Sequence, residues 1–175
     1  MAGHSKWAQI KRAKGANDIA RGRLFAKMGK EISVAVKLGG VDPNTNSRLA
    51  TAIAKAKSNN MPNDNIDRCI KKDTSKTNFE SMTYEGYAIG GVAVLVEALT
   101  DNKNRTASEV RAAFERNGGS LGVTGSVSFM FDKVGEEFVP QYHVPVPPEN
   151  EKAFEKMLDA LDESDDVQEV WHNAE

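Results

Sequence analysis

The stretch Gly91-Val92-Ala93-Val94-Leu95-Val96-Glu97-Ala98-Leu99 decides the fold of the C-terminal part of this 175-residue chain. Its apolar residues run almost without interruption, and alternate valines fall on one side, as expected for a largely buried strand. Thr106-Ala107-Ser108-Glu109 follows with the pattern of a capping box, which opens a helix. Asn117-Gly118-Gly119 is a typical end for that helix. The sequence therefore predicts a strand followed by a helix.

The residues that follow repeat this alternation. Ser126–Phe131 alternates like a strand, and so does Glu137–Val146, whose prolines favour an edge or bent strand. A helix is predicted next from the spacing of Phe154, Met157, Leu158 and Leu161, and Val167–Trp171 closes as a strand. The order βαββαβ is typical of a ferredoxin-like domain, in which two helices cover one face of an antiparallel sheet.

The N-terminal part has helical rather than strand periodicity. An amphipathic helix is predicted from about Asn17 to Gly39-Gly40, because its apolar residues recur at helical spacing: Phe25, Met28, Ile32 and Val36. A second helix begins near Asn46 or Ser47, and a third begins with Pro62 in its first turn, where the missing N–H is harmless. Three short helices joined by small loops predict a basic three-helix bundle.

These patterns predict an α+β protein with two domains. The polar stretch 73–83 suits a linker. We expect residues 1–78 to form a basic helical domain with an N-terminal arm, and residues 79–175 to form an acidic ferredoxin-like α/β domain.

Charge is divided between the two parts. Residues 1–78 hold 16 Lys and Arg against 6 Asp and Glu, whereas residues 79–175 hold 7 against 19, so the net charge of −2 hides a strong dipole. A basic module attached to an acidic one indicates a polyanionic partner, such as nucleic acid or an anionic membrane.

The densest basic segment is the arm with the first helix. Its cations surround Trp7, and an exposed indole there could stack on an unpaired base while Lys and Arg neutralise phosphates. The alternative is that Trp7 packs as a hydrophobic plug on the bundle. The predicted nucleic-acid-binding residues are Lys6, Trp7, Lys11, Arg12, Lys14, Arg21, Arg23 and Lys27. A second, weaker cluster comprises Lys55, Lys57, Arg68, Lys71 and Lys72, some of which helix-dipole compensation explains.

Other classes of protein find little support. The single cysteine, Cys69, excludes an internal disulfide and a Cys-based zinc cluster, and the three histidines show no metal-ligand spacing. The acidic residues of 159–166 fit a solvated helix end better than a catalytic pair. No run is long and apolar enough to cross a bilayer. We therefore expect a non-enzymatic cytoplasmic protein with no cofactor, no metal, no membrane partner and no small-molecule substrate.

The glycine-rich run 117–125 could suggest a phosphate cradle. Dinucleotide and P-loop motifs follow a strand and open a helix, whereas this run follows a helix and leads toward a strand. A tight connecting loop is the favoured interpretation.

Several short sequence motifs, each present once, follow one another along almost the whole chain. They are Ala2-Gly3-His4-Ser5-Lys6-Trp7, Asn60-Met61-Pro62 with Asp64-Asn65-Ile66, Tyr84-Glu85-Gly86-Tyr87, Gly90-Gly91-Val92-Ala93-Val94, Thr100-Asp101-Asn102 with Asn104-Arg105-Thr106, Asn117-Gly118-Gly119 with Gly122, and Asp165-Asp166-Val167-Gln168 with His172-Asn173. With these motifs the chain resembles the YebC family of probable transcriptional regulators, which includes the mitochondrial translational activator of cytochrome c oxidase.

The resemblance implies a helical N-terminal domain followed by α/β domains, no catalytic activity and a role in gene expression. Members are described as DNA-binding transcriptional regulators or as ribosome-associated factors. This chain departs from the family in one respect: the family's inserted α/β domain is essentially absent, because Phe131–Gly135 passes almost directly into Glu137–Pro140.

Two functional hypotheses follow. The first is a regulator that docks through its basic domain on nucleic acid, either ribosomal RNA or DNA, or on the ribosome itself. The lack of an obvious recognition helix and the tryptophan in a basic arm favour structured RNA slightly. The second is a protein-interaction or self-association module in which the basic half of one molecule meets the acidic half of another.

Overall fold

The computed structural model describes Trp7 and residues 18–175. Its N-terminal helices are α2 (Asp18–Gly39), α3 (Ser47–Ser58) and α4 (Asn63–Lys71). They share one apolar core, formed by Met28, Ile32, Ala35, Leu49, Ala52, Ala56, Met61 and Ile66. The three predicted helices are thus present, and they pack through the faces that their apolar spacing indicated.

Asn46 fixes the turn between the first two of these helices. Its Oδ1 accepts a hydrogen bond from the Leu49 N–H at 3.1 Å and so caps α3, while its Nδ2 donates to the carbonyls of Ala35 and Gly40, each at 2.8 Å. The side chain lies so close to Gly39 that a Cβ there would come within 2.7 Å of it. Glycine at the end of α2 therefore allows this buried cap to form.

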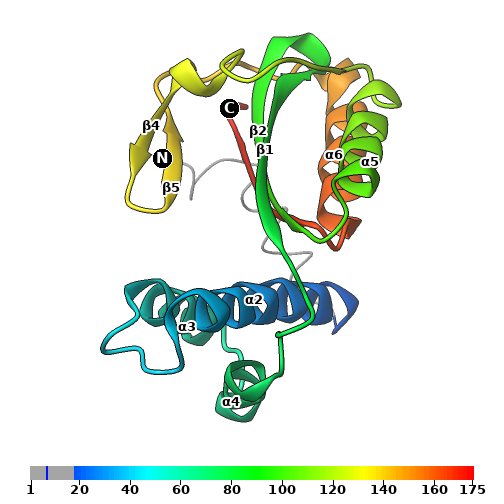
Figure 1. Cartoon of the computed structure of the whole chain (residues 1–175). Helices are drawn as coiled ribbons and strands as arrows, with labels where there is room; N and C mark the ends of the chain where they lie inside the picture. Colours follow the sequence, from blue (N-terminus) through cyan, green and yellow to red (C-terminus); the bar gives the residue numbers. More distant parts are fainter. Residues whose placement is uncertain (1–6, 8–17) are drawn as a thin grey trace.

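The C-terminal half is built on a four-stranded antiparallel sheet. Its strands are β1 (Glu80–Ala88), β2 (Val92–Thr100), β3 (Ser120–Leu121) and β6 (Val167–His172), in the spatial order β3-β1-β2-β6. The short 3-10 turn η2 (Ile89–Gly91) joins β1 to β2. Helices α5 (Lys103–Glu115) and α6 (Pro148–Glu163) cover one face of this sheet (Figure 1).

The opposite face is covered by a separate hairpin of β4 (Phe131–Val134) and β5 (Glu137–Pro140), preceded by the 3-10 helix η3 (Ser128–Met130). Strand β2 is consequently buried on both sides. Val92, Val94 and Val96 face the helices, while Ala93 and Leu95 face the hairpin. This explains why its sequence is an apolar run that only Glu97 interrupts before Thr100.

The α+β class is confirmed, but the order of strands differs from the predicted βαββαβ. The chain runs ββαβ, then the hairpin, then αβ. Strand β1 takes up the last four residues of the stretch 73–83 that was expected to be linker, so the connection is residues 72–79. Of the stretch 126–131, predicted as one strand, only Phe131 lies in a strand, as the first residue of β4; the rest is a bend and η3, because Val127 and Met130 both enter the core at a spacing of three residues.

Candidate nucleic-acid interface

Four of the eight predicted binding residues, Lys6, Lys11, Arg12 and Lys14, lie outside the described residues. The other four, Trp7, Arg21, Arg23 and Lys27, are placed by the structure. Only Arg21 among them is an exposed cation, and its guanidinium lies 3.7 Å from the Asp18 carboxylate.

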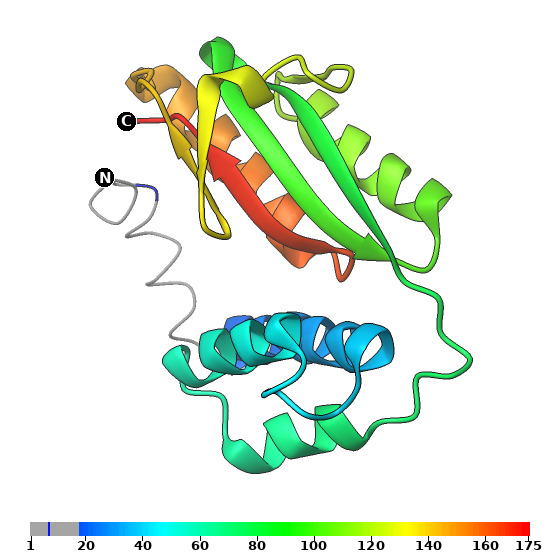
Figure 2. The same cartoon turned by 60° about the vertical axis from the view of Figure 1, so that its left-hand side comes forward.

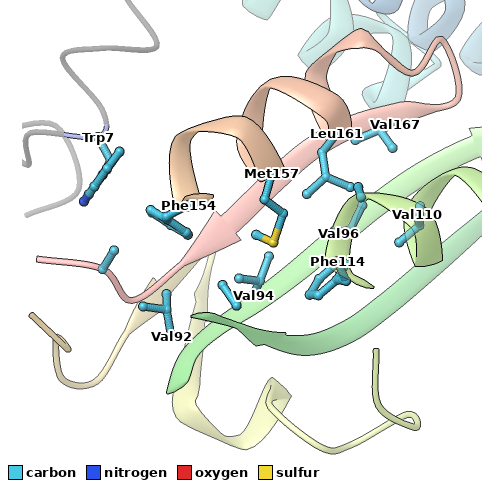
Figure 3. Packing of buried hydrophobic residues seen from close by; sticks show 13 residues of the cluster. Trp7, Val92, Val94, Val96, Val110, Phe114, Phe154, Met157, Leu161 and Val167 are labelled. Atoms are coloured by element: carbon cyan, nitrogen blue, oxygen red, sulfur yellow. The ribbon is translucent and has the colours of Figure 1, made fainter. Parts of the chain in front are cut away.

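Trp7 is buried, with 3% of its surface exposed. Its ring packs edge-on against Phe154 of α6, with ring centroids 4.7 Å apart and an interplanar angle of 86° (Figure 3). It therefore belongs to the core between the sheet and its helices. The buried indole is not available to stack on a base, so we no longer count Trp7 among the binding residues. The alternative expectation, a hydrophobic plug, describes Trp7 better, but the ring packs on the α/β half and not on the helical bundle.

Arg23 and Lys27 face the protein's own acidic half. Lys27 Nζ donates to the backbone carbonyl of Asp162 at 2.6 Å and lies 3.6 Å from its carboxylate, and Arg23 lies 3.6 Å from the same carboxylate. The Lys27 side chain is only 8% exposed. Their expected role at the surface needs correction, because in this conformation both cations connect α2 to the end of α6.

Lys30 continues this contact one turn along α2. Its ammonium donates to the backbone carbonyls of Asp165 at 2.6 Å and Leu99 at 3.2 Å, and it lies 4.0 Å from the Asp166 carboxylate. Burial lowers the pKa of Lys30, and the neighbouring carboxylates offset that effect only in part. The contact thus carries a desolvation cost for a buried ammonium.

Asp166 is the buried centre of the acidic side. Arg105 binds it with two hydrogen bonds of 2.9 and 2.7 Å, and the Thr106 hydroxyl donates a third at 2.9 Å. Burial raises the pKa of Asp166, but the hydrogen bonds from Arg105 and Thr106 outweigh burial and bring that pKa below its usual range. The motif around Asn104-Arg105-Thr106 therefore fixes the start of β6 to the start of α5.

Lys55 and Gln168 complete the contact between the halves. Lys55 of α3 lies 3.1 Å from the Glu169 carboxylate and 3.3 Å from that of Glu31. Gln168 Nε2 donates to the Lys27 backbone carbonyl at 2.8 Å. Acidic residues near the end of α6, interpreted from sequence as a solvated helix end, in part pair with cations of the other half.

A different set of cations remains exposed. Arg68 and Lys71 lie in the last turn of α4 and Lys72 directly follows it, and the structure gives these three residues no ion pair within its described part. The same holds for Arg48 and Lys57 of α3. Helix α4 packs on the side of α2 that is turned away from the sheet (Figures 1 and 2). We call Arg68, Lys71 and Lys72 the outer cations.

The glycine-rich loop holds a carboxylate of the protein itself. Glu85 of β1 accepts backbone hydrogen bonds from Gly125 at 2.6 Å, Val127 at 3.1 Å and Ser128 at 2.6 Å. Burial raises the pKa of Glu85, but these three N–H donors prevail and lower it. The loop therefore acts as a structural connection rather than a cradle for phosphate.

Metal-ligating residues do not cluster in the part of the chain that the structure describes. No group of three His, Cys, Asp or Glu residues in that part could hold a metal ion. One polar pocket of about 410 Å³ lies beside the start of α5, and its lysine, Lys103, is paired with Glu80 at 2.6 Å. In the part of the chain that the structure covers, we find no helix with the length and apolarity required to cross a membrane.

Comparison with known proteins assigns the family. The domain described as "TACO1/YebC protein N-terminal domain" matches residues 5–76, and "TACO1/YebC second and third domain" matches residues 79–136 and 136–174. The chain belongs to the TACO1/YebC family. The two later matches meet at Glu136, in the turn of the β4–β5 hairpin.

Relatives extend this similarity to whole proteins. The chain is 43% identical over 239 aligned positions to a probable transcriptional regulatory protein of Thermoanaerobacter pseudethanolicus, covering 100% of this chain and 97% of that protein. A probable transcriptional regulatory protein of Treponema denticola is 57% identical over 163 residues, which are 91% of this chain and 64% of the relative. An alignment of 239 positions exceeds the 175 residues of this chain, so the first relative has residues without a counterpart here.

A solved structure shares the fold. The crystal structure of a conserved hypothetical protein from Aquifex aeolicus superimposes with a TM-score of 0.78 at 36% identity, covering 90% of this chain and 91% of that one. The α+β arrangement is thus found in an experimentally determined relative.

Proposed function

We propose that this chain is a cytoplasmic, non-enzymatic regulator of gene expression that binds nucleic acid through its helical half. Residues 1–78 would be the binding unit, and residues 79–175 an acidic unit without the family's inserted domain. Two facts support this: relatives carry the name probable transcriptional regulatory protein, and the outer cations are exposed at the end of α4, the helix that lies on the side of α2 turned away from the acidic half.

The single observation that carries the proposal is this placement of the outer cations. Lysine and arginine bind phosphates and release condensed counterions, so exposed cations without a carboxylate partner contribute most. The carboxylates of the α/β half repel the same polyanion and orient it toward α4. Lys6, Lys11, Arg12 and Lys14, which lie outside the described residues, stay part of the proposal as phosphate-binding cations.

Whether the chain binds RNA or DNA is to be decided by experiment. Because Trp7 is buried, the stacking argument that favoured RNA no longer applies, and phosphate binding alone is common to RNA and DNA. A hairpin RNA and a DNA duplex of matched length, both of mixed sequence, serve as the two probes.

Charge reversal tests the proposal. In the triple variant Arg68→Glu, Lys71→Glu, Lys72→Glu, affinity at low salt should fall by about 30-fold or more, and the salt dependence should lose a slope of about 2 to 3. A matched control reverses three exposed cations of the acidic half: Arg116→Glu, Lys152→Glu and Lys156→Glu. Equal losses in both triples, or none in the first, would contradict docking through α4.

Self-association is a second candidate, favoured by the opposite charges of the two halves. In head-to-tail pairing the outer cations of one molecule would meet carboxylates of the next. Gel filtration of the nucleic-acid-free protein should then show a larger species at low salt that dissociates as salt rises. A single elution position at every salt concentration would remove this candidate.

A further inference from the structure

The contact between the two halves is built mainly from charged groups. We call Arg23, Lys27 and Lys30 of α2 with Lys55 of α3 the inner cations. They meet the segment from Asp162 to Glu169, which connects α6 to β6. Apart from Trp7, the residues of each buried apolar cluster come from one half only. Trp7 precedes α2 in the chain but packs in the core of the α/β half.

This contact is incompletely satisfied. Arg23 Nε and Gln168 Oε1 are buried without a hydrogen-bond partner among the described residues. An unpaired buried polar atom costs free energy, and buried ion pairs recover little of their desolvation cost. Polar contacts between domains of one chain commonly permit relative motion. The exposed polar connection, residues 72–79, provides a place for that motion.

The chemistry on the two sides resembles that of a complex with nucleic acid. Asp162, Asp166 and Glu169 present anionic oxygens to ammonium and guanidinium groups at 3.1 to 4.0 Å, and backbone carbonyls supply further acceptors. A phosphate backbone offers the same cations a row of anionic oxygens, with the additional gain of counterion release. The same inner cations could therefore exchange one set of anionic partners for the other.

We propose that the inner cations form a second phosphate-binding surface, which the chain's own segment 162–169 occupies until nucleic acid displaces it. This inference rests on the proposed function, because it concerns the same polyanion. In the closed form the outer cations make the first contact. In the open form the inner cations add to them, so the affinity depends on how firmly the acidic segment holds α2.

Neutralising the acidic segment tests the proposal. The release variant is Asp162→Asn, Asp165→Asn, Glu169→Gln; it leaves Asp166 intact, since that residue holds Arg105 within the α/β half. The control variant, Glu136→Gln, Glu137→Gln, Glu149→Gln, removes the same charge at exposed positions away from the contact. Small-angle scattering of the free proteins and salt titrations with the hairpin RNA and the DNA duplex are the measurements.

In the release variant we expect a larger radius of gyration, affinity about tenfold higher than that of the wild type, and a salt slope steeper by about 2 to 3. The control should keep the wild-type dimensions and slope and change affinity by about twofold at most. If the release variant opens without a steeper slope, or stays closed, the inference is wrong. If wild type and release variant both bind neither probe, the proposed function and this inference fail together.

A measurement on the wild type avoids dependence on the folding of a triple variant. Zero-length carbodiimide coupling should join Lys55 to Glu169, whose charged groups lie 3.1 Å apart, and mass spectrometry identifies the bond. Saturating RNA or DNA should suppress this cross-link several-fold while leaving the Lys103–Glu80 cross-link within the α/β half unchanged. An undiminished Lys55–Glu169 bond in the saturated complex overturns displacement, although the proposed function would stand.

Discussion

Helices α2 and α4 both carry closely spaced cations, but the two sets meet different surroundings. On α2, Lys27 and Lys30 are largely buried against carboxylates and carbonyls of the α/β half. On α4, Arg68 and Lys71 are exposed, with no ion pair given to them in the described part of the chain. Similar local sequence therefore leads to an internal contact in one helix and an open surface in the other.

The difference shows that charge density along a chain does not measure charge available to a partner. A cation paired within its own fold must first lose that partner, whereas an exposed cation binds phosphate at once. Trp7 is the apolar counterpart of a paired cation: its ring is already buried within the fold, so it contributes to stability rather than to recognition.

The largest expected effect comes from Trp7. Trp7→Ala should lower the free energy of unfolding by about 3 kcal/mol, because it removes a large buried ring that packs against Phe154. Phe129→Ala, which truncates a ring that is 67% exposed, should change it by about 0.5 kcal/mol at most. Urea denaturation measures both. If Trp7→Ala instead kept full stability and lost nucleic-acid affinity, the indole would belong with the exposed groups.

The next effect concerns Asp166 and depends on pH. Its pKa is lower in the folded protein than the usual value of about 3.9, so its charge stabilises the fold above that pH and the contribution is lost as pH falls through the folded pKa. Asp166→Asn should cost about 2 kcal/mol at pH 7, and the difference from wild type should shrink below about pH 4.

Asp101 provides the control for Asp166, since its carboxylate binds the same Arg105 at 2.8 Å but is 49% exposed. Asp101→Asn should cost about 0.5 kcal/mol or less. Denaturation curves from neutral to acidic pH separate the two. A pH-independent loss in Asp166→Asn would mean that packing, rather than the charge, stabilises this position.

The sequence predicted the N-terminal helices well because their information is local, whereas α5 begins at Lys103 with Asn102 as its cap and not at the capping box expected from Thr106. Apolar spacing, with the helix starts expected near Asn46 or Ser47 and at Pro62, places the three N-terminal helices within a residue or two. Strand β1 was not predicted, because many of its residues are polar. Glu85 is tolerated in this interior strand because a loop about 40 residues later supplies three N–H donors to its carboxylate. No local pattern shows such a partner.

The site was harder to predict for the same reason. Lys27 and its acceptor on Asp162 are 135 residues apart, so counting nearby charges assigned Lys27 to a binding surface. One signal was present: the acidic cluster at the end of α6 is complementary to the basic face of α2. The exposed cluster on α4 was noted from sequence as the weaker of the two, and it is the one the fold leaves open.

The smallest effect compares the two helices directly, by replacing one lysine in each with an uncharged chain of similar length. Lys27→Met should lower stability by about 1 kcal/mol, a modest value because Asp162 is 49% exposed and regains water when its partner is lost. Lys71→Met should leave stability within about 0.5 kcal/mol of wild type but reduce the salt slope of nucleic-acid binding by about 1. Urea denaturation and salt titration measure the pair. If Lys71→Met destabilised the protein as much as Lys27→Met, the exposed cation would also be structural, and the distinction between α2 and α4 would disappear.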